Sequence, residues 1–121
     1  MVDCDILVVE DEALIAMDIE MTLEEAGHEN IAVCHSVNEA MTQIDKSIPR
    51  LALLDFNLGK DTTSLPVAER LADNQVPVIF LSGYTESTVE IPEELSGAKR
   101  MAKPFRGDEL VATAQGALNS G

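Results

Sequence analysis

Basic residues are scarce in this chain. Its 121 residues include eight Lys and Arg against 22 Asp and Glu, which gives a formal net charge of −14. A surface this acidic repels the phosphates of nucleic acids and the headgroups of anionic membranes, so neither is expected as a partner. Divalent cations and basic protein surfaces are attracted instead.

Long hydrophobic segments are also missing. The longest unbroken apolar run, Ala13–Met17, has five residues, whereas a helix needs roughly 20 to cross a bilayer. The first residues are acidic, where a secretory signal would be basic and then apolar. A cytoplasmic location is therefore expected. The only two cysteines, Cys4 and Cys34, are expected to remain reduced thiols outside any disulfide.

No shift of composition, linker or internal repeat divides the chain. Its length suits one domain, since domains typically have about 100–150 residues. The content of 45% hydrophobic and 25% charged residues is typical of a globular fold. We therefore expect a single domain over residues 1–121. The last predicted helix ends close to the end of the sequence, so no attached effector domain is expected.

Short apolar runs predict the strands. Four runs have four residues each, are rich in branched side chains and do not alternate with polar residues. This pattern is typical of strands buried on both faces of a parallel sheet. A weaker fifth strand is expected at Lys99–Ala102. The four runs are Ile6–Val9, Ile31–Cys34, Leu51–Leu54 and Val78–Leu81.

Segments of helical length separate most of these runs. Gly27 is a common residue just past the end of a helix, and Ser36 with Glu39 three residues later predicts a capping box. Met17 and Met21 are expected in the core. The alternation of strands and helices predicts an open, doubly wound α/β sheet. Helices are expected over Glu12–Ala26, from Ser36 to Lys46, from Ser64 to about Asn74 and over Asp108–Asn119.

The segment between the fourth and fifth strands has a different composition. Residues Tyr84–Ala98 include Pro92 and several β-branched side chains. Proline lacks the amide donor of a regular helix and clashes with the preceding turn. A fourth helix that is short or irregular is therefore expected here.

Polar side chains follow the predicted strands at the points where they end. Ligands of open parallel sheets bind outside the carboxyl ends of the strands, so these side chains are expected to share one shallow site. Clustered carboxylates repel one another, and Mg²⁺, which prefers hard oxygen ligands, would offset that repulsion. The residues are Glu10 and Asp11 after the first strand, Asp55 after the third, Ser82 after the fourth and Lys103 after the fifth.

This set of residues suits phosphoryl transfer. An aspartate can attack phosphorus as a nucleophile when a divalent cation neutralises charge on the transferring group. Asp55 would then form an aspartyl phosphate, while Lys103 and Ser82 would bind the remaining phosphoryl oxygens. The residues therefore predict a domain that accepts a phosphoryl group at Asp55.

The order of these residues resembles that of the response-regulator receiver domain of bacterial two-component signalling. The resemblance covers the whole chain and is carried by Val8–Glu12, Leu54 with Asp55, Ser82, and Lys103–Phe105. It implies a five-stranded parallel sheet in the order 2-1-3-4-5, the flavodoxin-like receiver fold. It also implies a phospho-acceptor that catalyses only its own phosphorylation and dephosphorylation, not an enzyme with an external substrate.

The resemblance also implies roles for particular residues and partners. Asp55 is implied as the aspartate phosphorylated by a sensor histidine kinase or a histidine phosphotransfer protein, with a downstream protein as the target. Ser82 is implied as the hydroxyl switch and Lys103 as the lysine at the phosphoryl group. The implied Mg²⁺ ligands are the side chains of Glu10, Asp11 and Asp55 and the backbone carbonyl of Asn57.

Two departures from the family pattern concern the switch. Arg100 stands three positions before Lys103, where receivers commonly have an aromatic residue that rotates inward. The sequence F-L-S-G-Y at Phe80–Tyr84 resembles a receiver subgroup whose fourth strand ends F-A-T-G-Y. In that subgroup the fourth helix is short or disordered, and the partners are often histidine kinases of the HWE or related types. We therefore expect Tyr84, the only tyrosine, to report phosphorylation and to shield the acyl phosphate from water.

Three other functions are compatible with parts of this pattern. A pseudo-receiver would bind partners without phosphorylation, although the acidic set is complete. A haloacid-dehalogenase-like phosphatase would also use Asp55 as a nucleophile, but Asn57 stands where that family needs a second acid. A flavodoxin-like cofactor binder would need a phosphate-binding loop after the first strand, where the acidic segment Glu10–Glu12 stands instead.

Overall fold

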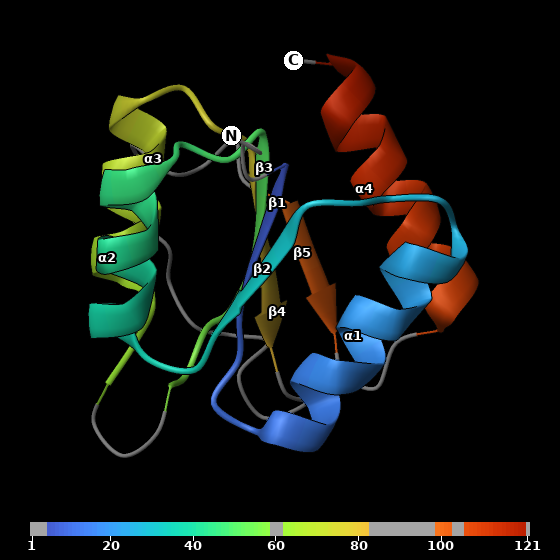
Figure 1. Cartoon of the computed structure of the whole chain (residues 1–121), viewed down its shortest axis with the longest axis horizontal. Coiled ribbons are helices and arrows are strands. Elements are labelled where there is room, and N and C mark those ends of the chain that lie inside the picture. The colour runs from blue at the N-terminus through green and yellow to red at the C-terminus, as the bar shows by residue number, and fades with distance from the viewer. Residues whose placement is uncertain (1–4, 59–61, 83–98, 103–105, 121) are drawn as a thin grey trace.

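A five-stranded parallel β-sheet forms the centre of the fold (Figure 1). The computed structural model describes residues 5–58, 62–82, 99–102 and 106–120. The strands lie in the order β2-β1-β3-β4-β5 and all pairs are parallel, so the predicted sheet is confirmed. The strands are β1 (Ile6–Val9), β2 (Ile31–Cys34), β3 (Leu51–Asp55), β4 (Val78–Ser82) and β5 (Lys99–Ala102).

Helices cover both faces of the sheet. Within the described residues, α2 and α3 lie against one face and α1 and α4 against the other (Figure 1), which confirms the doubly wound arrangement. None of the helices in this part of the chain is long and apolar enough to span a membrane. The irregular helix predicted over Tyr84–Ala98 lies outside the described residues. The helices are α1 (Ala13–Glu25), α2 (Val37–Lys46), α3 (Leu65–Asp73) and α4 (Gly107–Ser120).

Each central strand is buried on both faces because helices cover both sides of the sheet, and successive side chains point to opposite sides. In β1, Leu7 and Val9 pack in the cluster that includes α2 and α3. Ile6 and Val8 pack in the cluster that includes α1 and α4. All four side chains are fully buried. This two-sided burial explains why the strands read as unbroken apolar runs.

Helix α1 carries apolar side chains on both of its sides. Met17 and Met21 are 53% and 51% exposed, and Leu14 is 81% exposed. The prediction that Met17 and Met21 belong to the core is therefore wrong. At about 100° per residue, these three side chains lie on the side of α1 opposite its buried face. The buried residues of α1 are Ala16, Ile19 and Leu23.

Helix α1 ends at Glu25, and Gly27 lies just past its end, as the sequence predicts. Gly27 has a φ of +98°, a left-handed conformation that glycine adopts without a steric penalty. The backbone amide of Gly27 donates to the carbonyl of Glu24 at 3.0 Å, and the amide of His28 donates to the carbonyl of Leu23 at 3.1 Å. This pair of bonds is the Schellman motif, which satisfies the last carbonyls of the helix.

The turn from β2 into α2 carries the predicted helix cap. β2 ends at Cys34, directly before this turn. Cys34 is a buried thiol that forms no disulfide within the described residues. Cys4 lies outside those residues. The backbone amide of Glu39 donates to Oγ of Ser36 at 3.2 Å. The Glu39 carboxylate accepts from the backbone amide of His35 at 3.2 Å. The capping residues are thus as predicted, but the returning bond reaches one residue before the cap.

Candidate functional site

The register of the sheet places Glu10 and Asp55 next to each other, at the carboxyl ends of β1 and β3. Val9 of β1 pairs with Leu54 of β3, so the residues that follow them lie side by side at the carboxyl edge of the sheet. The backbone amide of Glu10 also donates to the carbonyl of Cys34 at 3.0 Å. This bond continues the β1–β2 ladder beyond Val9 and fixes the backbone at the start of the site.

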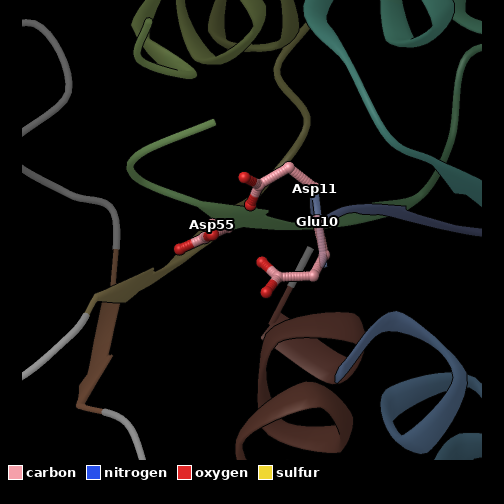
Figure 2. Close-up of side chains that lie close together, drawn as sticks. All are labelled: Glu10, Asp11 and Asp55. Carbon is pink, nitrogen blue, oxygen red and sulfur yellow. The ribbon is translucent and has the colours of Figure 1, made fainter. Parts of the chain in front are cut away.

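Three carboxylates converge at this edge (Figure 2). One carboxylate oxygen each from Glu10, Asp11 and Asp55 lie within 4.8 Å of one another. Glu10 is completely buried and Asp55 is 5% exposed, whereas Asp11 is exposed. We call these residues the acidic triad. Two carboxylates of the triad are therefore buried, and one is exposed to solvent.

The donor set of the acidic triad fits a magnesium ion. Two ionised carboxylates at this separation repel each other by roughly 3–4 kcal/mol at an effective dielectric constant of about 20. Burial of Glu10 and Asp55 reduces the screening by solvent and salt. Mg²⁺ prefers carboxylate oxygens and water as ligands, so a site of three carboxylates with one side open to solvent suits it.

Two further predicted site residues lie close to Asp55, Ser82 through the pairing of β4 with β3 and Asn57 along the chain. Ser82 is the last residue of β4, directly after Leu81, the strand partner of Asp55. Asn57 follows the end of β3 and forms an isolated antiparallel bridge with Thr63. The backbone of Asn57 is therefore held beside the carboxyl end of β3. The roles of Ser82 and Asn57 remain predictions.

The other predicted site residues lie in or after β5 and after β4. Arg100 is an exposed residue of β5 and pairs with Phe80 of β4. Lys103 directly follows Ala102, the last residue of β5, but itself lies outside the described residues. Tyr84 lies outside them as well. The roles expected for Arg100, Lys103 and Tyr84 remain predictions.

The structure adds one residue that the sequence pattern does not single out. His35 follows β2 directly, and its ring nitrogen Nδ1 lies 3.0 Å from the backbone oxygen of Glu10. The only sequence signal for this contact is the position of His35 at the end of the strand that neighbours β1. A single histidine after a strand does not identify its partner, because the partner depends on the register of the sheet.

Comparison with models of known protein families shows which family this chain belongs to. The family model of the response regulator receiver domain matches residues 6–115, which include the whole acidic triad. The chain belongs to this family. Receiver domains are signalling phospho-acceptors of two-component systems, and the acidic triad of this receiver domain is typical of their Mg²⁺ sites.

Similar proteins include regulators and solved receiver structures. The phyllosphere-induced regulator PhyR of Methylorubrum extorquens is 39% identical over 118 residues, which are 94% of this receiver domain and 43% of PhyR. The receiver domain of NtrX from Brucella abortus is 30% identical with a TM-score of 0.85, over 97% of this chain and 100% of that one. SdrG from Sphingomonas melonis is 33% identical with a TM-score of 0.78, over 97% of each chain. The chain spans about half the length of the curated relatives it matches.

Proposed function

We propose that this receiver domain takes a phosphoryl group onto Asp55 from a sensor histidine kinase or a histidine phosphotransfer protein in the cytoplasm. The phosphorylated domain then binds a downstream protein differently from the unphosphorylated one. The observation that carries this proposal is the acidic triad, in which Asp55 is held at the carboxyl edge of the sheet beside two further carboxylates.

The chemical step that we propose is a direct displacement at phosphorus. A carboxylate oxygen of Asp55 attacks the phosphorus atom of a phosphohistidine and forms a P–O bond. The bond between phosphorus and the donor imidazole nitrogen breaks, and its electron pair stays on that nitrogen.

The acidic triad is proposed to hold Mg²⁺ through Glu10, Asp11 and Asp55, with the backbone carbonyl of Asn57 as a further ligand. When bound there, Mg²⁺ would neutralise charge on the transferring phosphoryl group. Lys103 is proposed to add a second positive charge at that group, and the hydroxyl of Ser82 a hydrogen bond.

The residues present favour this function over the two nearest alternatives. A pseudo-receiver does not need a complete acidic triad, and this chain has one. A haloacid-dehalogenase-like phosphatase needs a general acid two residues after its nucleophile, and Asn57 cannot donate or accept a proton in that role.

Phosphorylation by a small donor tests the proposed function without any knowledge of the natural kinase. The purified domain is incubated with acetyl phosphate in Mg²⁺ or in EDTA, and its intact mass is measured. We expect the mass of one added phosphoryl group in Mg²⁺ and little or none in EDTA. An unchanged mass in both samples would contradict the proposal.

An exposed apolar stripe on α1 suits the docking of the phosphoryl donor. It consists of Leu14, Met17 and Met21, and α1 begins at Ala13, shortly after Asp11. A donor histidine that reaches Asp55 must bring its own protein surface against the start of α1. We therefore propose that this stripe packs against apolar side chains of the histidine kinase or phosphotransfer protein.

Substitution of Met17 by Glu separates docking from chemistry. We expect Met17→Glu to slow phosphotransfer from an autophosphorylated histidine kinase of the same organism by roughly tenfold, the effect of about 1.4 kcal/mol on association. Phosphorylation by acetyl phosphate should be unchanged. The matched control is Ile48→Glu, because Ile48 is 44% exposed but precedes β3, at the opposite edge of the sheet. Equal phosphotransfer rates for both variants would contradict the docking proposal.

Tyr84 is proposed to replace the usual aromatic switch, because Arg100 stands at the position of that switch. We place the chain on this basis in the receiver subgroup with the F-A-T-G-Y-like fourth strand. If Tyr84 shields the acyl phosphate, Tyr84→Ala should shorten the lifetime of the phosphorylated protein, measured by intact mass after removal of the donor. Tyr84→Phe, which keeps the ring, should resemble the wild type. Equal lifetimes for all three proteins would rule out shielding.

A further inference from the structure

Both backbone polar groups of Glu10, its amide and its carbonyl, contact residues at the end of β2. Its amide donates to the carbonyl of Cys34 at 3.0 Å, as expected for a parallel ladder in which Val9 pairs with Cys34. Its carbonyl oxygen lies 3.0 Å from Nδ1 of His35. The second contact uses a side chain, because β2 ends at Cys34 and the chain then turns into α2.

The chemistry of the contact fixes its direction. A carbonyl oxygen can only accept a hydrogen bond, so Nδ1 of His35 carries the proton and donates it. The Glu10 carbonyl belongs to the peptide group that links Glu10 to Asp11, and that group is planar. A bond that orients this carbonyl therefore also orients the amide of Asp11, and with it the backbone from which two members of the acidic triad project.

His35 is itself anchored by the start of α2. Its backbone amide donates to the carboxylate of Glu39 at 3.2 Å, and the backbone amide of Glu39 donates to Oγ of Ser36 at 3.2 Å. The cap of α2 and the Glu10–Asp11 peptide are thus joined through one residue. The backbone of His35 is therefore held at the start of α2.

We infer that His35 is a positioning residue for the metal site of this receiver domain. Its Nδ1–H group holds the Glu10–Asp11 peptide in the orientation that lets both carboxylates meet Asp55. This inference rests on the proposed function only in that the acidic triad binds Mg²⁺. Partners that orient metal ligands commonly contribute strongly to metal affinity, although they do not touch the ion.

The test compares a variant that loses the donor with one that retains it. His35→Ala removes the N–H group, whereas the side-chain amide of His35→Asn places an N–H group as many bonds from Cα as Nδ1 is. We expect His35→Ala to weaken Mg²⁺ binding by roughly threefold to tenfold, and His35→Asn to restore most of that loss. Binding is measured by NMR titration of the ¹⁵N-labelled domain with MgCl₂. Asn38→Ala, at an exposed position on α2, is the control and should bind as the wild type does.

A second measurement separates positioning from general stability. The free energy of unfolding of each variant is measured by chemical denaturation in EDTA and in MgCl₂. The difference between these two free energies is then compared among the variants. Positioning by His35 predicts a smaller difference for His35→Ala, whereas a merely structural role predicts an equal difference at lower stability. Equal Mg²⁺ affinity of His35→Ala and wild type, or equal losses in His35→Ala and His35→Asn, would overturn the inference. Failure of the wild type to bind Mg²⁺ would instead overturn the proposed metal site.

Discussion

Asp55→Asn is expected to abolish phosphorylation of this receiver domain. The substitution keeps the size and shape of the side chain but replaces the carboxylate by a neutral amide, which does not act as a nucleophile at phosphorus. Asp55 is nearly buried between β1 and β4, so a side chain of the same size should be accommodated. After incubation with acetyl phosphate and Mg²⁺, the intact mass of the variant should be unchanged, whereas the wild type gains one phosphoryl group.

The matched control for this experiment is Asp73→Asn. Asp73 is an exposed residue at the end of α3, so the same chemical change there should leave phosphorylation as in the wild type. Peptide mapping of the wild type after borohydride reduction, which cleaves acyl phosphates, should place the modification at Asp55. Phosphorylation of Asp55→Asn to the wild-type level would show that another residue is the acceptor.

Magnesium is expected to stabilise the folded domain, and Asp11→Asn is expected to remove most of that effect. A ligand that binds only the folded state stabilises it by mass action, by about 1.4 kcal/mol at roughly ten times its dissociation constant. For a domain of this size that corresponds to roughly 5 °C in Tm. This stabilisation by Mg²⁺ comes from the acidic triad, where two of three converging carboxylates are buried. These carboxylates repel each other until a cation is bound.

Thermal unfolding in EDTA and in a MgCl₂ series measures this effect. Asp18→Asn is the matched control, because Asp18 is an exposed residue of α1 outside the acidic triad and the change in net charge is the same. We expect the control to keep the full increase in Tm and Asp11→Asn to keep only a small part of it. A wild-type Tm that does not respond to Mg²⁺, or an equal response in both variants, would contradict the metal site.

The strands could be predicted almost to the residue because their signal is local. A four-residue apolar run such as Leu51–Leu54 has no polar face to place in solvent, so only burial on both sides accommodates it. The observed strand continues to Asp55. A polar residue at the end of a buried strand still belongs to the ladder when its neighbours supply backbone hydrogen bonds, and no local pattern reports that.

The exposed stripe on α1 could not be predicted in the same way. Apolar side chains occur on both sides of this helix, so the periodicity does not choose which side faces the sheet. The packing against β1 and the other strands buries Ile19 and Leu23 and leaves Met17 and Met21 exposed. Only the neighbours of the helix in three dimensions make that choice.

The sequence by itself determined the kind of fold and the residues at the carboxyl ends of the strands, since apolar runs and the polar residues that follow them are properties of consecutive positions. It also indicated phosphoryl chemistry, because carboxylates, a hydroxyl and a lysine at such ends suit it. Only the tertiary structure decided that Glu10, Asp11 and Asp55 come within 4.8 Å and that His35 contacts the Glu10 backbone. The reason is physical: these contacts join segments far apart along the chain, and the register of the sheet sets their separation.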